Sequence, residues 1–285
     1  MASLREQYSV SKLLKLYDVR ASTFYDAQAR GECEHDKYSE LRLQVRDKHA
    51  LSYGSAGQRM LIELLKSEEI STTRYMMRKI MREEGLVSKQ RRKKPYPKGG
   101  DTSLIAPNLL TSQFDVTSIN RWWSGDITYV WTQQGWVYLA VVIDLMSRRV
   151  IAHEVSSSPN SQLTAAVFNR AFESRGQPQN VVFHSDQGCQ YSSAEFQHCL
   201  KNKGVKQSMS RRGNCWDNAP TERFFGSYKS ERMPKLGYEN IDDALADINH
   251  YIDYYYNCVR PHTANNGLPP IEAEYHAVPT TMKVN

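Results

Sequence analysis

Long apolar runs are missing from this 285-residue sequence. A helix that crosses a membrane needs about 20 consecutive apolar residues, and no run here approaches that length. The opening residues, MASLREQYSV, also lack the apolar core of a secretory signal. The sequence therefore argues against a helical membrane protein and predicts a soluble intracellular one.

Cysteine is sparse and widely scattered. The chain has five, an odd number, and no two of them form a C-x-x-C pair. Disulfide frames and zinc sites both depend on paired or closely spaced cysteines. We therefore expect reduced thiols and no structural zinc; the five are Cys33, Cys189, Cys199, Cys215 and Cys258.

Acidic residues are under-represented in the front of the chain. Residues 1–100 contain 21 Lys and Arg against 13 Asp and Glu, a net charge of +8, whereas the remainder has 16 against 18, a net charge of −2. A hydrophobic content of 40% supplies core for one large domain or two to three small ones. The positive front indicates contact with a nucleic acid.

The basic charge is densest between Arg74 and Lys98, where ten basic residues stand beside two acidic ones. This stretch ends in KQRRKKPYPKGG, whose prolines and glycines predict an extended linker over residues 91–115. A basic linker can follow a phosphate backbone, although such charge runs also occur on plain solvated segments. The linker residues that we expect to contact DNA are Arg91, Arg92, Lys93 and Lys94.

Residues 1–50 carry the pattern of two short helices joined by a tight turn. Apolar residues at positions 10–14 have helical spacing, the pattern breaks around Asp18, and a second helix is predicted from Ser22 or Thr23 as far as Gly31. A helix-turn-helix of this size can enter a DNA major groove, but such hairpins are common in any small helical domain. We interpret this part as a helix-turn-helix region.

Residues 51–90 repeat the arrangement as a second helical DNA-binding element. A break near Ser71, which together with Thr72 is predicted to cap the second helix, separates two helical stretches, and the second stops at Gly85. The predicted core positions of the second stretch are Met76, Met77, Ile80 and Met81. A separate face carries Arg74, Arg78 and Arg82, one every four residues, which suits DNA contact and equally suits a solvated helix.

After the linker the pattern changes to strands and then alternates. GDITYVW, GWVYLAVVIDLM and RRVIAHEVSS predict three sequential strands in an antiparallel meander. A helix, a strand at QNVVFHSD, a helix, a short strand at VKQSMS and a long helical stretch from about Asn218 follow. This order predicts an α/β fold with a mixed sheet flanked by helices over residues 116–285. The tyrosines of the tail IDDALADINHYIDYYYN are expected to pack rather than to stack on bases.

Three carboxylates stand at informative places in this pattern. Asp126 is a charge inside an apolar strand, Asp186 ends a later strand, and Glu222 opens a helix that Asn218 can cap. Asp186 taken alone also fits ordinary turn chemistry. Together the three form an oxygen-rich set of the kind that magnesium prefers. Lys229, two helical turns after Glu222, is well placed to bind a DNA phosphate.

Neighbouring polar residues have plainer interpretations. His184, two residues before Asp186, fits either a second layer around a metal or a core histidine. Asn218 is first a helix cap and second a DNA contact. Asp144 ends a strand before LMSRR, and we expect a turn residue with a structural salt bridge.

With 35 residues between Asp186 and Glu222 and a lysine seven beyond the glutamate, the pattern resembles the D-D-35-E signature. That signature belongs to retroviral integrases and to OrfB-type DDE transposases of insertion sequences. The words APNLL, GDITYV, VIDLMSRRVI, HSDQGCQYSS, DNAPTERFFGSYKSE and RPHTANNGLPP resemble the OrfB pattern in the same order. Gly125 stands where a threonine is common and Tyr228 where a leucine is common, which puts local packing in question rather than the chemistry.

The resemblance implies a ribonuclease-H-like core with a five-stranded mixed sheet. It implies Mg²⁺, with Mn²⁺ as a substitute and two ions per site when DNA is bound, held by Asp126, Asp186 and Glu222. The implied reaction is cleavage of the 3′ strand at an element end, followed by attack of the freed 3′-hydroxyl on another phosphodiester. The implied partners are the terminal repeats and target DNA, further copies of the chain in a synaptic complex, and an upstream-frame OrfA chain or fusion. A bacterial, nucleoid-associated cytoplasmic protein is expected.

Two other interpretations stay open at this point. The chain can act mainly as a DNA-binding regulator whose core is idle without the upstream partner, since no heptad zipper is present. The other alternative is a ribonuclease-H-like nuclease on the same fold. DNA cleavage and end joining separate them, and removal of residues 1–100 should weaken DNA binding and flatten its salt dependence.

Overall fold

The computed structural model describes residues 8–32, 38–89, 106–109, 116–210 and 218–277. The chain divides into two compact units, Met1–Arg46 and Asp47–Asn285, which are described separately here. The predicted linker residues Arg91, Arg92, Lys93 and Lys94, and also Cys33 and Cys215, lie outside the described residues.

The first unit contains the predicted pair of short helices, α1 (Val10–Leu16) and α2 (Ala21–Glu32), and the start of α3 (Ser39–Leu51). Asp18 takes a positive φ of 50° in the turn between α1 and α2. The second helix begins at Ala21, ahead of the predicted start, and continues through Gly31, which does not end it. The predicted stop is therefore wrong, because a glycine lowers helix stability without forbidding the conformation.

The second unit begins with the end of α3, which is followed by α4 (Gln58–Lys66) and α5 (Arg74–Glu83). Thr73 caps α5 by accepting a hydrogen bond of 3.2 Å from the Met76 amide, so the cap directly follows the predicted pair Ser71 and Thr72. The helix ends just before Gly85, as predicted, and this glycine has a φ of +65°. Of the predicted core, Met77 and Ile80 are buried.

The predicted five-stranded mixed sheet is confirmed. It consists of β1 (Trp122–Thr132), β2 (Gly135–Asp144), β3 (Val150–Ser156), β4 (Val182–Ser185) and β5 (Lys206–Met209), in the order β3-β2-β1-β4-β5. Strands β1, β2 and β3 form the antiparallel meander, and β4 and β5 run parallel to β1. This is the ribonuclease-H-like arrangement that the resemblance implied.

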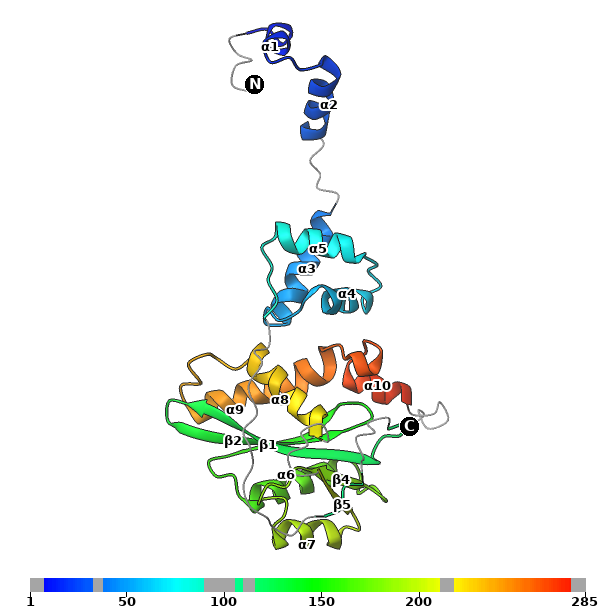
Figure 1. The fold of residues 1–285 in the computed structure, drawn as a ribbon, viewed down its shortest axis with the longest axis vertical. Coiled ribbons are helices and arrows are strands. Elements are labelled where there is room, and N and C mark those ends of the chain that lie inside the picture. Colours follow the sequence, from blue (N-terminus) through cyan, green and yellow to red (C-terminus); the bar gives the residue numbers. More distant parts are fainter. Residues whose placement is uncertain (1–7, 33–37, 90–105, 110–115, 211–217, 278–285) are drawn as a thin grey trace. The chain divides into compact units, whose positions relative to one another are not determined.

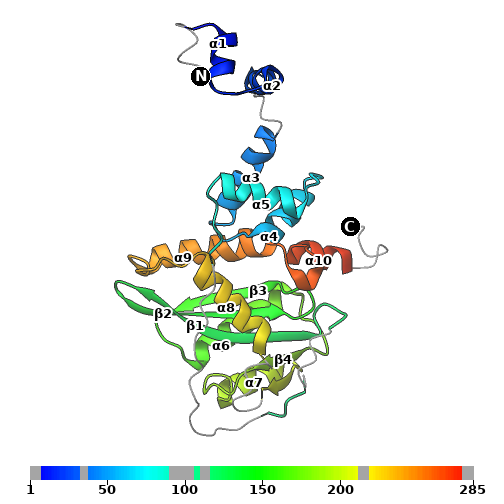
Figure 2. The ribbon, with the colours of Figure 1, turned by 45° about the horizontal axis from the view of Figure 1, so that its top comes forward.

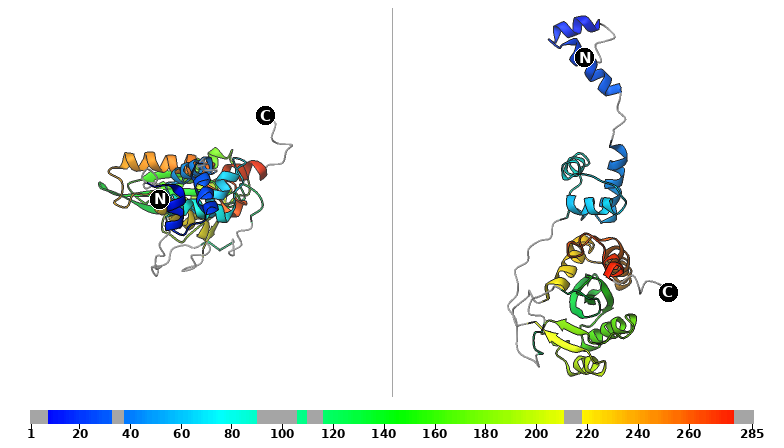
Figure 3. Two further views of the ribbon diagram at one scale, coloured as in Figure 1. Left: turned by 90° about the horizontal axis from the view of Figure 1, so that it is seen from above. Right: turned by 90° about the vertical axis from the view of Figure 1, so that its right-hand side faces the viewer.

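Helices cover both faces of the sheet (Figures 1 and 3). One face carries α6 (Ser161–Ser174) and α7 (Ala194–Asn202), and the other carries α8 (Ala219–Glu231), α9 (Ile241–Asn249) and the π-helical segment η3 (His250–Val259). The last elements of the described part of the chain are η4 (Thr263–Asn265) and α10 (Pro270–Ala277). The long helical stretch expected from Asn218 is wrong as one element, because it breaks after Glu231 and restarts at Ile241.

Strand β1 alternates between the two faces as predicted. Ile127 packs against the core beneath α6 and α7, whereas Val130 belongs to the core beneath α8 and η3. Asp126 shares the face of Val130 because strand side chains alternate with a period of two. Its side chain is therefore on the face of the sheet that carries α8. Figure 2 shows how α8 crosses the sheet. Tyr251, Tyr255 and Tyr256 are buried on this side, which confirms that the tail tyrosines pack.

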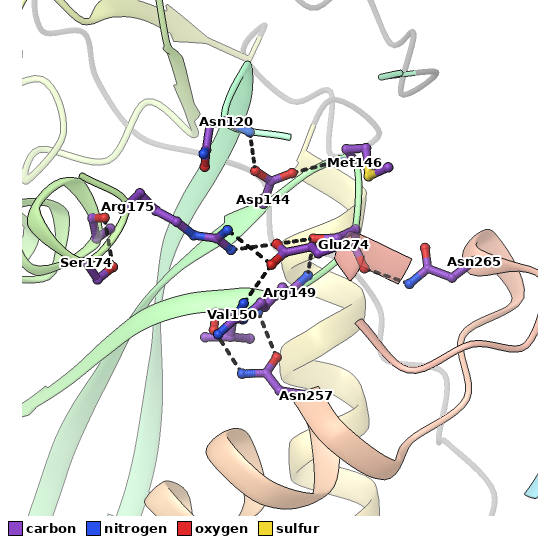
Figure 4. A network of polar contacts seen from close by, with 12 residues as sticks. Asn120, Asp144, Met146, Arg149, Val150, Ser174, Arg175, Asn257, Asn265 and Glu274 are labelled. Atoms are coloured by element: carbon purple, nitrogen blue, oxygen red, sulfur yellow. Dashed lines mark hydrogen bonds and ion pairs between the residues drawn. The ribbon is translucent and has the colours of Figure 1, made fainter. Parts of the chain in front are cut away.

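A polar network fastens α10 to the turn between β2 and β3 (Figure 4). The buried Glu274 pairs with Arg149 at 2.6 Å and with Arg175 at 2.5 Å. Burial by itself would raise the pKa of Glu274, but the hydrogen bonds and charges of Arg175 and Arg149 outweigh it and lower that pKa. Helix α10 is thus held beside the sheet by charge.

The expected salt bridge of Asp144 is wrong. Its fully buried carboxylate accepts hydrogen bonds from the backbone amides of Asn120 at 2.7 Å and Met146 at 2.9 Å, and the described residues include no ion pair to it. Burial raises the pKa of Asp144, and the two amide hydrogen bonds oppose that shift. Backbone amides that face a turn carboxylate satisfy it at short range, so the nearby arginines pair with Glu274 instead.

Candidate active site at the β1, β4 and α8 junction

Asp126 and Asp186 are neighbours through strand register. Ser124 on β1 pairs with His184 on β4 in parallel. Each aspartate follows its member of that pair by two residues, Asp126 within β1 and Asp186 directly after the end of β4. Adjacent strands lie about 4.8 Å apart, so the register brings two carboxylates from distant parts of the sequence to one place on the sheet.

Helix α8 is fastened to the same strand by hydrogen bonds. The Ser124 hydroxyl donates to the Asn218 Oδ1 at 2.6 Å, and the Thr221 hydroxyl donates to the Ser124 Oγ at 2.7 Å. All three side chains are buried. Glu222 follows Thr221 directly, so these bonds set the first turn of α8, and with it Glu222, over the strand that carries Asp126.

The predicted cap role of Asn218 is wrong in its detail. Asn218 occupies the residue before α8, and Pro220 lies in the first turn as expected, but the Asn218 side chain makes no capping hydrogen bond. Its amide oxygen is used by Ser124 instead. Sequence reasoning missed Ser124 and Thr221, because a small hydroxyl residue carries no signal that tells a helix-to-strand tie from an ordinary buried serine or threonine.

The charges of the three carboxylates act on one another. Burial and then the charge of Asp186 raise the pKa of Asp126 well above its usual range, and Glu222 raises it further. A hydrogen bond of 2.7 Å from the Ile127 amide and the positive charge of Lys229 oppose the shift. Asp186, Glu222 and Lys229 therefore all lie within electrostatic reach of Asp126.

Asp186 is held by its own turn. Its Oδ1 accepts a hydrogen bond from the Gly188 amide at 2.9 Å. Burial raises the pKa of Asp186, and this amide hydrogen bond opposes the shift. The carboxylate is thus oriented by the backbone that follows the strand.

The carboxylates do not form a closed metal cage in this structure. Within the described part of the chain, no group of three or more His, Cys, Asp or Glu side chains is arranged to hold a metal ion. The donor set contains oxygen atoms only, and its members repel one another, so a hard divalent cation would relieve the repulsion. The residues fit such an ion in chemistry and charge, and holding it jointly requires the side chains to move from their present positions.

The remaining predicted residues are placed as follows. His184 is buried, and its Nδ1 lies 2.9 Å from the Ser208 Oγ on β5, a bond that fits the core-histidine interpretation. Arg74, Arg78 and Arg82 are all exposed on α5. Cys189 is an exposed free thiol. Among the residues that the structure describes, no helix is both long and apolar enough to span a membrane.

Comparisons with known proteins give the family. Two models described as integrase core domain match residues 117–215 and 203–270. The chain is 32% identical over 269 residues to the putative transposase InsK for insertion sequence IS150 of Escherichia coli, covering 94% of each chain. It is 31% identical over 268 residues to the 31 kDa protein of insertion element IS600 of Shigella sonnei, covering 93% of this chain and 98% of that one. It is also 39% identical over 195 residues to the transposase InsF for IS3A of Escherichia coli, covering 68% of each.

Solved structures are more distant. The simian T-cell lymphotropic virus intasome is similar with a TM-score of 0.46 and 18% identity, covering 85% of this chain and 77% of that one. The HTLV-2 integrase catalytic core domain, solved in complex with magnesium, is similar with a TM-score of 0.41 and 21% identity, covering 54% of this chain and 96% of that one. The assignment rests on the sequence relatives, which extend over nearly the whole chain: the protein belongs to the insertion-sequence DDE transposases with an integrase core domain.

Proposed function

We propose that this transposase cuts the 3′ strands at the ends of its element and joins the freed 3′-hydroxyls to target DNA. The observation that carries the proposal is the register of β1 with β4, which makes Asp126 and Asp186 neighbours, together with the Ser124 tie that sets Glu222 above them. This arrangement supports one site with three carboxylates.

The cofactor proposed for this site is Mg²⁺, with Mn²⁺ as a substitute and two ions when DNA is present. When bound, such ions supply activation of the attacking oxygen and stabilisation of the leaving oxygen at a phosphodiester. Asp126 and Asp186 would share the ions, and Glu222 would complete the second position. The repulsion that raises the pKa of Asp126 supports this assignment, because bound cations would remove it.

The roles of the basic residues follow from the chemistry of the substrate. Lys229 lies two turns beyond Glu222 on α8 and would hold a phosphate of the element end. The exposed arginines of α5 and the basic linker would add contacts with the DNA backbone. Hydrolysis leaves a 3′-hydroxyl and a 5′-phosphate, and that hydroxyl then displaces a 3′-oxygen from the target strand. The reaction would take place at the bacterial nucleoid, between chains assembled on two element ends, with an OrfA chain or fusion as a further partner.

The test uses labelled terminal-repeat DNA of the element with Mg²⁺ or Mn²⁺. Replacing a metal ligand costs more than the loss of a residue that only supports one, so Asp126→Asn should lower the cleavage rate more than about 100-fold. Asp242→Asn, which removes an exposed carboxylate in the first turn of α9, is the charge-matched control and should cleave as wild type does.

Equal cleavage by wild type and Asp126→Asn contradicts the proposal. Strands that stay intact with both proteins, while DNA is still bound, would support the regulator interpretation instead. Preferential cutting of RNA in a hybrid, with no joined 3′ ends, would support a ribonuclease-H-like nuclease.

A further inference from the structure

Helix α8 is fastened at both ends. Its first turn, which carries Glu222, is tied to β1 by the hydrogen bond from Thr221 to Ser124. Its last turn, which carries Lys229, is bonded to Arg260, the first residue of the word RPHTANNGLPP. The two ends of the helix therefore have separate attachments, one near each of its functional side chains.

The Arg260 guanidinium contacts α8 through two side chains. Its Nε donates to the Glu231 Oε2 at 3.0 Å, and its Nη2 donates to the Glu231 Oε1 at 2.6 Å and to the Ser227 Oγ at 3.3 Å. Ser227 lies two residues before Lys229, and Glu231 lies two residues after it. Residues two apart in an α-helix point about 160° away from each other. Arg260 therefore holds α8 on the face opposite Lys229.

The backbone around Arg260 brings its side chain to α8. Pro261 follows, and a residue before proline is biased away from the helical conformation, so η3 ends and Arg260 is extended, with φ −71° and ψ 117°. Its amide still donates to the Tyr255 carbonyl, five residues back, at 2.7 Å. Its guanidinium carbon lies 5.9 Å from the centroid of the Tyr256 ring. The arginine is thus held by its own chain segment as well as by α8.

The ion pair between Arg260 and Glu231 is largely buried. The two side chains are 18% and 9% exposed, and the Glu231 Oε2 also accepts a hydrogen bond of 2.8 Å from the Tyr251 hydroxyl. Burial alone would lower the pKa of Arg260, but the hydrogen bonds and the charge of Glu231 outweigh it and raise that pKa. A lysine cannot reproduce the planar fork that meets both carboxylate oxygens, so the contact depends on arginine.

We propose that Arg260 is a positioning residue that fixes the last turn of α8, so that Lys229 is presented to a DNA phosphate of the element end. The inference rests on the proposed function, which assigns that phosphate to Lys229. Because Ser124 holds the first turn of α8 independently, Arg260 governs the DNA contact of Lys229 and not the metal dependence of the three carboxylates.

The test compares Arg260→Lys with Arg175→Lys in the full chain. Arg175 is the matched control, because it donates two hydrogen bonds, of 3.1 and 2.5 Å, to the buried carboxylate of Glu274 in α10. Each change keeps the positive charge and removes the fork from a buried ion pair. Cleavage of labelled terminal-repeat DNA gives the maximal rate and the concentrations of DNA and of Mg²⁺ that support half of it, and urea unfolding gives the stability.

Arg260→Lys should raise the DNA concentration for half-maximal cleavage by about tenfold, because a displacement of about 1 Å in a group that positions the substrate can cost up to about 100-fold. The maximal rate and the Mg²⁺ concentration for half-maximal cleavage should stay unchanged. Arg175→Lys should match wild type in its DNA dependence, even where it loses as much stability as Arg260→Lys. In a Lys229→Ala background, Arg260→Lys should cause no further rise, because its effect passes through Lys229.

Four results would overturn the inference: an unchanged DNA dependence in Arg260→Lys, an equal rise in Arg175→Lys, a further rise in the Lys229→Ala background, or a raised Mg²⁺ requirement in Arg260→Lys. If Arg260→Lys does not fold, Glu231→Gln weakens the same contact from the side of α8 and is judged by the same outcomes. The proposed function fails separately, and is recognised by full cleavage in Asp126→Asn or by an unchanged DNA dependence in Lys229→Ala.

Discussion

His262 is a buried base surrounded by positive charge. Its ring meets that of Tyr256 edge to face, with centroids 4.7 Å apart, and its buried Nε2 has no hydrogen-bond partner among the residues that the structure describes. Burial first, and then the charges of Arg260, Arg148 and Arg223, lower the pKa of His262 to about 3, against a hydrogen bond to the Tyr256 backbone. The folded protein therefore holds this histidine neutral.

The acid stability of the protein should depend on His262. At pH values below the ordinary histidine pKa of about 6.5 and above the lowered pKa of the folded state, His262 is protonated in the unfolded chain but not in the folded one. The free energy of unfolding therefore falls as the pH falls through this range. The slope reaches up to about 1.4 kcal/mol per pH unit. Urea unfolding at pH 7.5 and pH 5.0 should show a larger loss for wild type than for His262→Gln.

Comparing wild type with His262→Gln separates the effect of His262 on the pH dependence of stability from the effects of carboxyl groups. Asp126, whose pKa is raised, acts in the opposite sense, because the folded state then binds the proton more tightly. Glu274, whose pKa is lowered, loses its contribution only as pH falls below its ordinary value near 4.5. Equal losses in wild type and His262→Gln between pH 7.5 and 5.0 would show that His262 is not the proton-linked group.

Between elements, the packing of β1 against β4 depends on Gly125, which has no side chain. A Cβ on Gly125 would lie 2.3 Å from the Cζ of Phe183, whose ring is fully buried. The ring thus passes over β1 at Gly125, where the resemblance to the OrfB pattern leads us to expect a threonine. Tyr228, the other departure, bonds its hydroxyl to that of Tyr238 at 2.9 Å, which in turn donates to Asp247 at 2.6 Å. Both departures are accommodated by local packing.

Gly125→Ala should destabilise the protein by about 1–3 kcal/mol, because an added methyl in a filled core forces neighbours out of place. Phe183→Leu should also destabilise, through the cavity that it leaves. The double variant should lose clearly less than the sum of the two, since the smaller side chain makes room for the methyl. Chemical denaturation of the four proteins measures this coupling, and strict additivity would contradict the proposed steric cause.

For the molecule as a whole, deleting the basic residues 1–100 as one piece would also destabilise the rest of the protein. Residues from Asp47 onward belong to the same compact unit as the catalytic core. Tyr53 packs edge to face on Tyr255 with centroids 5.1 Å apart, and the Lys89 ammonium donates to the Glu231 carbonyl at 3.1 Å. Removal of residues 1–100 would expose apolar core, so substitution is the sharper test of DNA binding.

Changing Arg74, Arg78 and Arg82 together to Gln should weaken DNA binding and lower the slope of log affinity against log salt by up to about 2.7, since each phosphate contact contributes about 0.9. The charge-matched control changes the exposed Arg170, Lys201 and Lys206 of the catalytic core to Gln. Fluorescence anisotropy across a salt series measures both. Equal slopes for the two triple variants would remove α5 from the DNA interface.

The sequence by itself determined the order and type of the core elements and the chemistry of the carboxylate set. Alternating strand residues placed Asp126 on a defined face, and turn residues ended the strand before Asp186. Both signals are local, so they can be recognised from the sequence. The five strands and the family followed from them. The ends of helices were harder to predict, as Gly31 and Thr73 show, because a glycine or a hydroxyl residue permits more than one local conformation.

Tertiary structure decided what depends on distant partners. The register of β1 with β4 and the tie of Ser124 to Asn218 and Thr221 each join residues tens of positions apart. A local pattern states which side chain is available, but not which of several hydrogen-bond partners it will meet once hydrophobic packing has fixed the backbone. The sequence therefore specifies which side chains the site contains, and long-range packing specifies how they are oriented.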